Sequence, residues 1–280
     1  MFSYPNDERQ NRAVLKVGNS TWSRPHSFEA IGNVADVVLP SSTKETELHI
    51  GISVDEGEGK YKMTKIVTLT PRFILKSKLP EAIQIREPST GSNNIMTLSP
   101  GELLPLHFLK ASERKQLTLL FPGINNRWSS PFNISDLGSV HVKMHKANQR
   151  QSLIRIDILQ EKATIFLHLS IEKKNWPFSI RNESSQEFTF YQADPNQDDD
   201  EEKESDFRPV YYKIPPRSIM PYAWDFPAAK SKELVLMVRD RKRHVRLAEI
   251  GNLVSSHLIF AKIDLKFLPT SRFLSKWKLA

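Results

Sequence analysis

The sequence predicts an all-β protein made of tandem β-sandwich-like repeats of about 105 residues, placed end to end as an elongated rod or arc. Two observations predict this fold class. Apolar and polar residues alternate along short segments bounded by Pro, Asn, Ser and Gly, which is typical of strands with one buried face. Blocks of similar sequence also recur in the same order at a nearly constant spacing.

The recurrence is clearest around a Trp-Ser-x-Pro motif. The block GNSTWSRPHSFEAIG ends at Gly32 and resembles INNRWSSPFNISDLG, which ends at Gly138, while a weaker copy, RKRHVRLAEIG, ends at Gly251. Further matches in the same order are ELHIGISV with LIRIDILQ, TPRFILKSKLPEAIQIRE with NWPFSIRNESSQEFTFYQ, LSPGELLPLHF with IPPRSIMPYAW, and KQLTLLF with KELVLMV.

These matches divide the chain. We predict the C-terminal part of an upstream β-repeat in residues 1–32, a full repeat in 33–138 and a second full repeat in 139–268. The second copy contains an insertion, ADPNQDDDEEKESDF at 193–207, which we interpret as a flexible acidic loop because it has few apolar residues. Residues 269–280 match no block and form an unmatched tail.

The strands follow from period-two patterns. ELHIGISV (47–54), LIRIDIL (153–159), EFTFYQ (187–192) and HLIFAKIDLKFL (257–268) alternate apolar and polar positions, as half-buried strands do. ATIFLHLSI (163–171) is more evenly apolar, as expected for a central strand. Helical periodicity never extends beyond about two turns, so no helical domain is expected.

Composition narrows the possible functions. The 280 residues include no cysteine, which excludes disulfides, cysteine-type zinc sites and a cysteine nucleophile. The net charge is +8, but Lys and Arg are scattered, which favours a diffuse surplus over a nucleic-acid interface. The densest cluster, RDRKRH (239–244), is interpreted as a solvated turn between strands. No segment resembles a signal peptide or a membrane span.

No arrangement of residues indicates catalysis. The sequence lacks H-E-x-x-H, G-x-S-x-G and P-loop motifs. His141 and His145 lie four positions apart in a strand-like pattern, about 13 Å from each other, which is too far to share a metal ion. We therefore expect no enzyme activity, no metal and no cofactor, and by elimination a binding role.

Several motifs closely resemble one family over about residues 8–254. They are SFEAIG, EGEGKYKMTKIVTLTPRFIL, NRWSSPFNISDLG, TIFLHLSIEKKNWPFSIRNESSQEFTFYQ and PPRSIMPYAWDFPA. They resemble the adaptor-binding domain, formerly the short-root-binding domain, of the vacuolar protein sorting 13 family. The resemblance implies part of a very long lipid transfer protein that is cytoplasmic and recruited to organelle membrane contact sites. It further implies a module of six β-repeats that binds Pro-x-Pro motifs of organelle adaptors, chiefly through its last two repeats, and reaches membranes through those adaptors.

The resemblance also points to a site. Asn182 occupies the position of the asparagine that marks each repeat of the family, whereas Ser77 stands there in the earlier full repeat. Asn182 either shapes the turn after its strand or contacts the adaptor, and we favour the structural role. Aromatic side chains that could line a peptide groove are Phe188, Phe190, Tyr191, Tyr211, Tyr212, Tyr222, Trp224 and Phe226. The alternative function is direct membrane or phosphoinositide binding through the basic surface.

Overall fold

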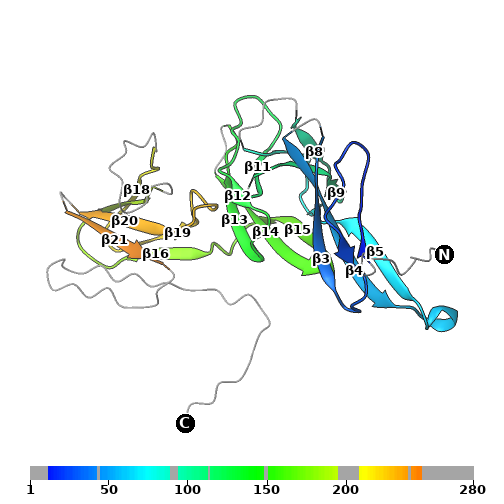
Figure 1. Cartoon of the computed structure of the whole chain (residues 1–280). Coiled ribbons are helices and arrows are strands. Elements are labelled where there is room, and N and C mark those ends of the chain that lie inside the picture. Colours follow the sequence, from blue (N-terminus) through cyan, green and yellow to red (C-terminus); the bar gives the residue numbers. More distant parts are fainter. Residues whose placement is uncertain are drawn as a thin grey trace, which may run out of the picture. The chain divides into compact units, whose positions relative to one another are not determined.

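The computed structural model describes residues 12–42, 45–88, 94–112, 114–147, 151–194, 208–238 and 241–247. Within these ranges the chain is all-β, with a short 3₁₀ turn at Gly59–Tyr61, so the predicted fold class is confirmed (Figure 1). The expected strand at 257–268, the tail 269–280 and most of the acidic loop lie outside the described residues. By its contacts the chain divides into two compact units, Met1–Ile171 and Glu172–Ala280.

The first unit holds fifteen strands within its described residues. They are β1 (Arg12–Ala13), β2 (His26–Ser27), β3 (Val34–Pro40), β4 (Thr46–Glu56), β5 (Lys65–Pro71), β6 (Phe73–Ser77), β7 (Ile83–Arg86), β8 (Met96–Leu98), β9 (Leu103–Leu106), β10 (Phe108–Lys110), β11 (Gln116–Leu120), β12 (Phe132–Asn133), β13 (Gly138–Met144), β14 (Ser152–Glu161) and β15 (Thr164–Glu172).

Two sheets of this unit face each other as a sandwich. One has the order β13-β14-β15-β6-β9 and the other the order β12-β11-β7-β8. Strand β15 runs parallel to β6, with Ile165 opposite Phe73 and Leu169 opposite Ser77. The evenly apolar segment expected to be central is β15, which lies between β14 and β6.

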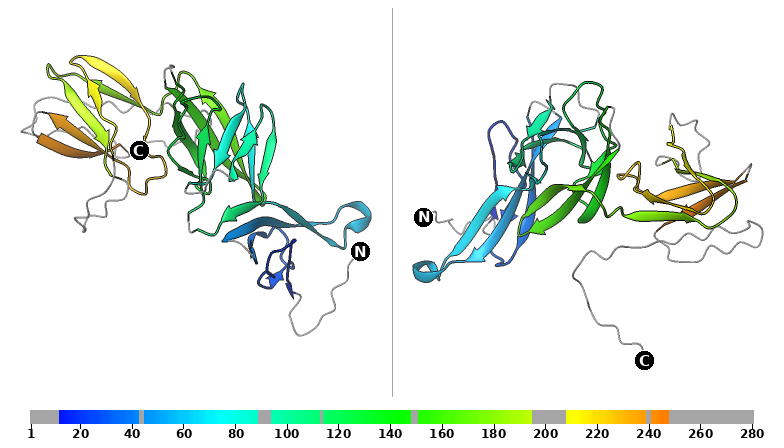
Figure 2. Two further views of the ribbon diagram at one scale, coloured as in Figure 1. Left: turned by 90° about the horizontal axis from the view of Figure 1, so that it is seen from above. Right: turned by 180° about the vertical axis from the view of Figure 1, so that it is seen from behind.

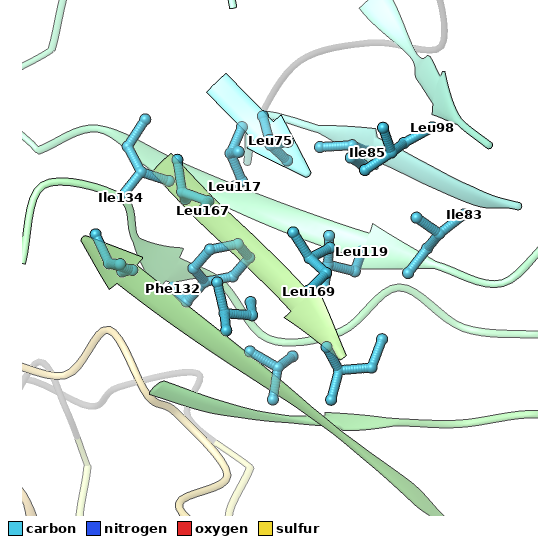
Figure 3. Packing of buried hydrophobic residues seen from close by; sticks show 14 of the residues in the cluster. Leu75, Ile83, Ile85, Leu98, Leu117, Leu119, Phe132, Ile134, Leu167 and Leu169 are labelled. Carbon is cyan, nitrogen blue, oxygen red and sulfur yellow. The ribbon is translucent and has the colours of Figure 1, made fainter. Parts of the chain in front are cut away.

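Apolar side chains from both sheets fill the space between them (Figure 3). Burial alternates along β6 and β7, so that every second residue points into this core. Leu75, Leu167 and Leu169 come from the first sheet, and Ile85, Leu117 and Phe132 come from the second. Each such side chain contributes roughly 1.5–3 kcal/mol by its burial.

A further sheet of the first unit is built around β4. Strand β4 pairs with β3 along one edge, and with β10 and β5 along the other. Strands β4 and β5 form a long hairpin with the 3₁₀ turn at its tip (Figure 2). Gly51 of β4 lies against the turn between β14 and β15, where a Cβ atom would come within 2.1 Å of the Ala163 carbonyl oxygen.

The second unit holds β16 (Phe178–Asn182), β17 (Phe188–Gln192), β18 (Tyr212–Ile214), β19 (Ser218–Tyr222), β20 (Glu233–Val238) and β21 (Arg241–Arg246). Its described strands form the sheets β16-β19 and β18-β17-β20-β21. The expectation that RDRKRH is a turn is wrong for Arg241–His244, since these residues belong to β21 and pair with β20.

Similar sequence blocks form similar strand pairs in the two units. Leu117 lies opposite Phe132 in the first unit, and Leu234 lies opposite Val245 in the second. The order β12-β11-β7-β8 likewise has its counterpart in β21-β20-β17-β18. The predicted repeat boundaries, the repeat length and the rod or arc shape remain predictions.

The close approach at Gly51 gives a first prediction. Gly51→Ala places a methyl group against backbone atoms of Ala163, which cannot move without disturbing β15. We expect a loss of about 1–3 kcal/mol in the free energy of unfolding, measured by urea denaturation. Ser53→Ala, which adds no volume on the same strand, is the matched control, and equal midpoints for the two variants would contradict the packing argument.

Charged side chains surround the buried ring of His49 in the first unit. Its Nδ1 lies 3.2 Å from an Asp36 carboxylate oxygen and its Nε2 lies 3.0 Å from Glu47 Oε1, while Glu47 also accepts a hydrogen bond from Lys115. Burial lowers the pKa of His49, but the two carboxylates outweigh burial and raise the pKa above its ordinary value of 6.5. Both ring nitrogens donate only in the protonated ring. The cluster thus joins β3, β4 and the turn before β11 most strongly when His49 is charged.

This cluster predicts a pH dependence of stability. A pKa that is raised in the folded state gives stability that is fully present below the unfolded pKa and is lost as the pH rises through the folded pKa. Unfolding free energy measured by urea titration should therefore fall as the pH rises above about 6.5. We expect His49→Gln to lose this part of the slope, and an unchanged slope in that variant would assign the pH dependence to other groups.

Candidate functional site around Asn182

Asn182 is the last residue of β16, where the chain leaves one sheet of the second unit for the other. Its side chain is 2% exposed. The amide nitrogen Nδ2 donates to the carbonyl oxygens of Gln186 (2.7 Å), Ile214 (3.1 Å) and Pro215 (2.9 Å). The amide oxygen Oδ1 accepts from the backbone N–H and the hydroxyl of Ser184, at 3.0 and 2.7 Å.

These bonds use the whole hydrogen-bonding capacity of the Asn182 side chain. An amide offers two N–H donors, here shared among three carbonyls, and two acceptor lone pairs, both occupied. The partners belong to two separate connections, the one after β16 and the one between β18 and β19. Asn182 therefore links two corners of the unit from inside, and a direct hydrogen bond to a ligand would require breaking one of these bonds.

Ser77, at the equivalent place in the first unit, makes one of the corresponding hydrogen bonds. Its hydroxyl accepts from the backbone N–H of Leu79 at 3.2 Å, as Asn182 Oδ1 accepts from Ser184 two residues further on. The serine has no amide that could reach carbonyls of other connections. The corner after the strand thus needs only an acceptor at this position. The additional hydrogen bonds to other connections are made by Asn182 alone of the two residues.

The eight aromatic candidates divide by burial. Phe188, Phe190 and Tyr222 are buried in the core of the second unit, and Tyr212 and Trp224 pack against that core. Tyr191 and Phe226 are half-buried, and Tyr211 is 58% exposed. The alternation along β17 explains the division, since Phe190 points inward and Tyr191 outward. Sequence reasoning listed all eight without this division.

A buried carboxylate fixes two of the core tyrosines. The hydroxyl of Tyr212 donates to Asp225 Oδ1 at 2.6 Å, and that of Tyr222 to Asp225 Oδ2 at 3.3 Å. Burial, together with the Asp225 carboxylate, raises the pKa of both hydroxyls, so both remain protonated donors. Sequence reasoning did not identify Asp225, which stands out only as an acidic residue inside an aromatic segment.

Gln192 fixes the backbone beside Asp225. Its side chain accepts from the Phe226 N–H at 2.9 Å and donates to the Phe226 carbonyl at 3.2 Å. This two-way bond attaches the segment after β19 to β17 in the same way as a backbone pair would. The position of the Phe226 backbone is thereby set by the sheet.

The aromatic surface that remains is a tyrosine pair. The rings of Tyr191 and Tyr211 lie 5.0 Å apart between centroids, in a tilted arrangement. Tyr191 lies opposite Val235 of β20, on the face of the sheet away from Phe190. Tyr191 lies on β17 and Tyr211 directly precedes β18, so the pair presents ring surface and two hydroxyl groups beside neighbouring strands. Such a surface suits an extended peptide segment better than a small polar substrate.

The described ranges hold neither a metal centre nor a membrane helix. Their His, Asp and Glu side chains do not gather into a group that could bind a metal ion. No helix within them is long and apolar enough to cross a bilayer. The described residues thus form an all-β module whose second unit carries a partly exposed tyrosine pair.

Comparison with known proteins gives the family. Residues 1–231 match the family described as vacuolar-sorting associated protein 13, adaptor binding domain, and the chain belongs to it. It is 55% identical over 259 residues to the intermembrane lipid transfer protein VPS13 of Chaetomium thermophilum. The aligned region covers 92% of this chain and 8% of that protein. It is 27% identical to vps13E of Dictyostelium discoideum and 24% identical to human VPS13D, each over 81% of the chain.

This membership confirms the resemblance seen in the sequence. The chain is a member of the adaptor-binding domain family, a non-catalytic module, and the relatives named above are intermembrane lipid transfer proteins. It spans 8%, 6% and 5% of the three relatives, respectively, so it corresponds to a small part of their length.

The geometry of Asn182 gives a further prediction. Asn182→Ser keeps an acceptor for the Ser184 N–H but removes the amide donor that the carbonyls of Gln186, Ile214 and Pro215 share. Gln186 and Pro215 retain the hydroxyls of Ser184 and Ser218 as donors, so the main loss is the link between the two segments. We expect a loss of roughly 1–3 kcal/mol in the free energy of unfolding, measured by thermal and urea denaturation. The reciprocal change Ser77→Asn serves as the control. A fully retained melting temperature in Asn182→Ser would refute the structural role.

Proposed function

We propose that the second unit binds short Pro-x-Pro motifs of organelle adaptors and thereby recruits a bridge-like lipid transfer protein from the cytoplasm to membrane contact sites. The observation that carries this proposal is the family match, which includes Asn182 and all eight aromatic candidates. On this proposal membranes are reached indirectly, through the adaptors.

The chemistry of the motif favours the tyrosine pair as its docking place. A Pro-x-Pro segment is extended, and its prolines cannot donate hydrogen bonds, so it depends on contacts with aromatic rings. The Tyr191–Tyr211 pair offers two adjacent rings on one sheet face. Tyr hydroxyls can in addition donate to the carbonyls that a proline-rich backbone leaves available. Core aromatics such as Phe190 and Tyr222 support this surface from below.

Asn182 has an indirect part in this proposal. Its bonds hold the connection that leads into β17, the strand that carries Tyr191. A change at Asn182 would therefore alter the register or order of β17 and weaken adaptor binding without removing a contact. The proposal separates a scaffold residue, Asn182, from contact residues on the outer face.

A second function has a specific observation in its favour. Strand β21 carries Arg241, Lys242, His244 and Arg246 as exposed residues. Glu233 on β20 forms ion pairs with His244 and Arg246 and so offsets part of this charge. Direct binding to an anionic lipid surface through β21 would be strongly salt-dependent.

Peptide binding tests the proposal. A synthetic peptide with a central Pro-x-Pro motif should bind with micromolar affinity, about −8 kcal/mol, in isothermal titration calorimetry. We expect Tyr211→Ala to weaken binding at least about tenfold, as for other aromatic anchors. Tyr61→Ala in the first unit, where Tyr61 is 47% exposed, is the matched control.

The outcomes separate the two functions. A folded chain that binds no Pro-x-Pro peptide would remove the first function, and normal affinity in Tyr211→Ala would move the docking place elsewhere. Co-sedimentation with vesicles that contain phosphatidylinositol phosphates, lost in Lys242→Glu and at high salt, would support the second function.

A further inference from the structure

The outer face of the sheet β18-β17-β20-β21 places the tyrosine pair in line with basic side chains. Residues directly opposite each other in an antiparallel sheet lie on the same face. Tyr191 lies opposite Val235, and Val235 lies opposite His244 of β21. Val235 itself is buried, so a partner meets the rings of Tyr191 and Tyr211 at one end of this row and His244 at the other.

The neighbouring rows of the same face end in further cations. Lys213 of β18 and Lys242 of β21 stand at the two ends of one row, with Thr189 and Met237 between them. On the other side of the tyrosine row, Arg246 lies on the same face of β21 as His244. The side chains of Lys213 and Arg246 are 72% and 63% exposed. A ligand on the tyrosine pair therefore has cations within its reach.

A carboxylate orients two of these cations. Glu233 Oε1 accepts from Arg246 Nε at 2.6 Å, and Oε2 lies 3.3 Å from His244 Nδ1. The hydrogen bond from Arg246 lowers the pKa of Glu233, which therefore stays ionised. Against this negative charge, β21 carries three arginines and one lysine besides His244. The strand thus keeps a surplus of positive charge.

The first unit has neither feature on its corresponding face. The residues that match RKRHVR of β21 are WSSPFN, 128–133, which carry no charge. Arg86 of β7 stands where Tyr191 stands in β17, one position after an inward-pointing side chain in each strand. Its guanidinium carbon lies 4.1 Å from the centroid of the Trp128 ring, so side chains of this unit pair with each other there. The fold itself therefore requires neither the basic strand nor the tyrosine pair.

We infer that this face of the second unit binds a peptide whose Pro-x-Pro motif lies on the tyrosine pair and whose acidic flank lies on β21. The inference rests on the proposed adaptor binding and narrows the partner to motifs that carry carboxylates on one side. The peptide lies across the strands, with its carboxylates on Lys242, His244 and Arg246.

The order of the strands sets the spacing within such a peptide. Neighbouring strands lie about 4.8 Å apart, so β21 is about 10 Å from β17 and about 14 Å from β18. An extended or polyproline segment advances about 3.1–3.3 Å per residue. Acidic residues about three to five positions from the motif therefore reach the cations of β21.

The mixture of charges on this face favours a peptide over a lipid surface. A flat anionic surface brings its charge against Glu233 as well as against the cations, and like charges repel. A peptide places one or two carboxylates at fixed positions and can contact Lys242 and Arg246 without approaching Glu233 equally closely. The tyrosine rings on the same face supply the contact that the prolines need.

Three peptides test the inference by isothermal titration calorimetry. All have the same Pro-x-Pro centre, and a pair of residues about four positions away is Ser-Ser in the first, Asp-Glu before the motif in the second and Asp-Glu after it in the third. One acidic peptide should bind about threefold to tenfold more tightly than the neutral peptide at low salt, and this gain should disappear in high salt.

The outcomes separate this inference from the function on which it rests. Equal affinities of the three peptides would overturn the acidic flank and leave Pro-x-Pro binding in place. If a folded chain binds none of them, the proposed function fails and the inference fails with it.

Variants of the sheet give an independent readout. Lys242→Glu should abolish the gain of the acidic peptide and leave the affinity of the neutral peptide unchanged. Lys173→Glu, an exposed change of the same charge before β16, is the matched control and should keep the gain. Glu233→Gln removes the competing carboxylate and should increase the gain at least about twofold.

Two results with these variants would contradict the inference. One is an undiminished gain of the acidic peptide in Lys242→Glu. The other is a loss of co-sedimentation with phosphatidylinositol phosphate vesicles in Lys242→Glu while the peptide affinities stay unchanged, which would assign β21 to lipid.

Discussion

The parallel pairing of β15 with β6 is the constraint on which the sandwich of the first unit depends. It joins three strands that come late in this unit, β13 to β15, to the β6-β9 pair that comes much earlier. Without it, neither group forms a sheet wide enough to cover Ile85, Leu119 and Phe132 of the opposing sheet. Parallel neighbours need a long connection, and here that connection includes all four strands of the opposing sheet. The core between the sheets thus forms only when chain segments far apart in sequence meet.

This pairing explains why the period of the sequence and the units of the fold have different phases. A sequence repeat can be counted from any residue, and Gly32 and Gly138 are convenient marks because the Trp-Ser-x-Pro block precedes them. The strands that follow Gly138 nevertheless complete the sandwich that precedes it. The stability of the sandwich in the first unit therefore includes the pairing of β15, which follows Gly138, with β6, which precedes it.

The sequence predicted the elements of the fold better than their partners. Period-two alternation located strands such as β4, β14 and β17, because one buried face imposes that pattern on any half-buried strand. It could not identify β9 and β15 as the two neighbours of β6, since pairing depends on geometry that alternation does not encode. It also placed Arg241–His244 in a turn, because an edge strand with a solvated face can be as polar as a loop.

The candidate site, like the fold, could be predicted from the sequence only in part. The family position of Asn182 was visible in the sequence, but its bonds to Ile214 and Pro215 join connections that lie far apart along the chain. A buried amide with all its partners satisfied is specific in a way that a serine is not, because any shift of either corner leaves polar groups unpaired. Ser77 tolerates more variation of its surroundings, since its hydroxyl bonds only within its own corner. The asparagine is therefore best understood as the residue that fixes the distance between two connections, and the surface carried by β17 inherits its order from that fixed distance.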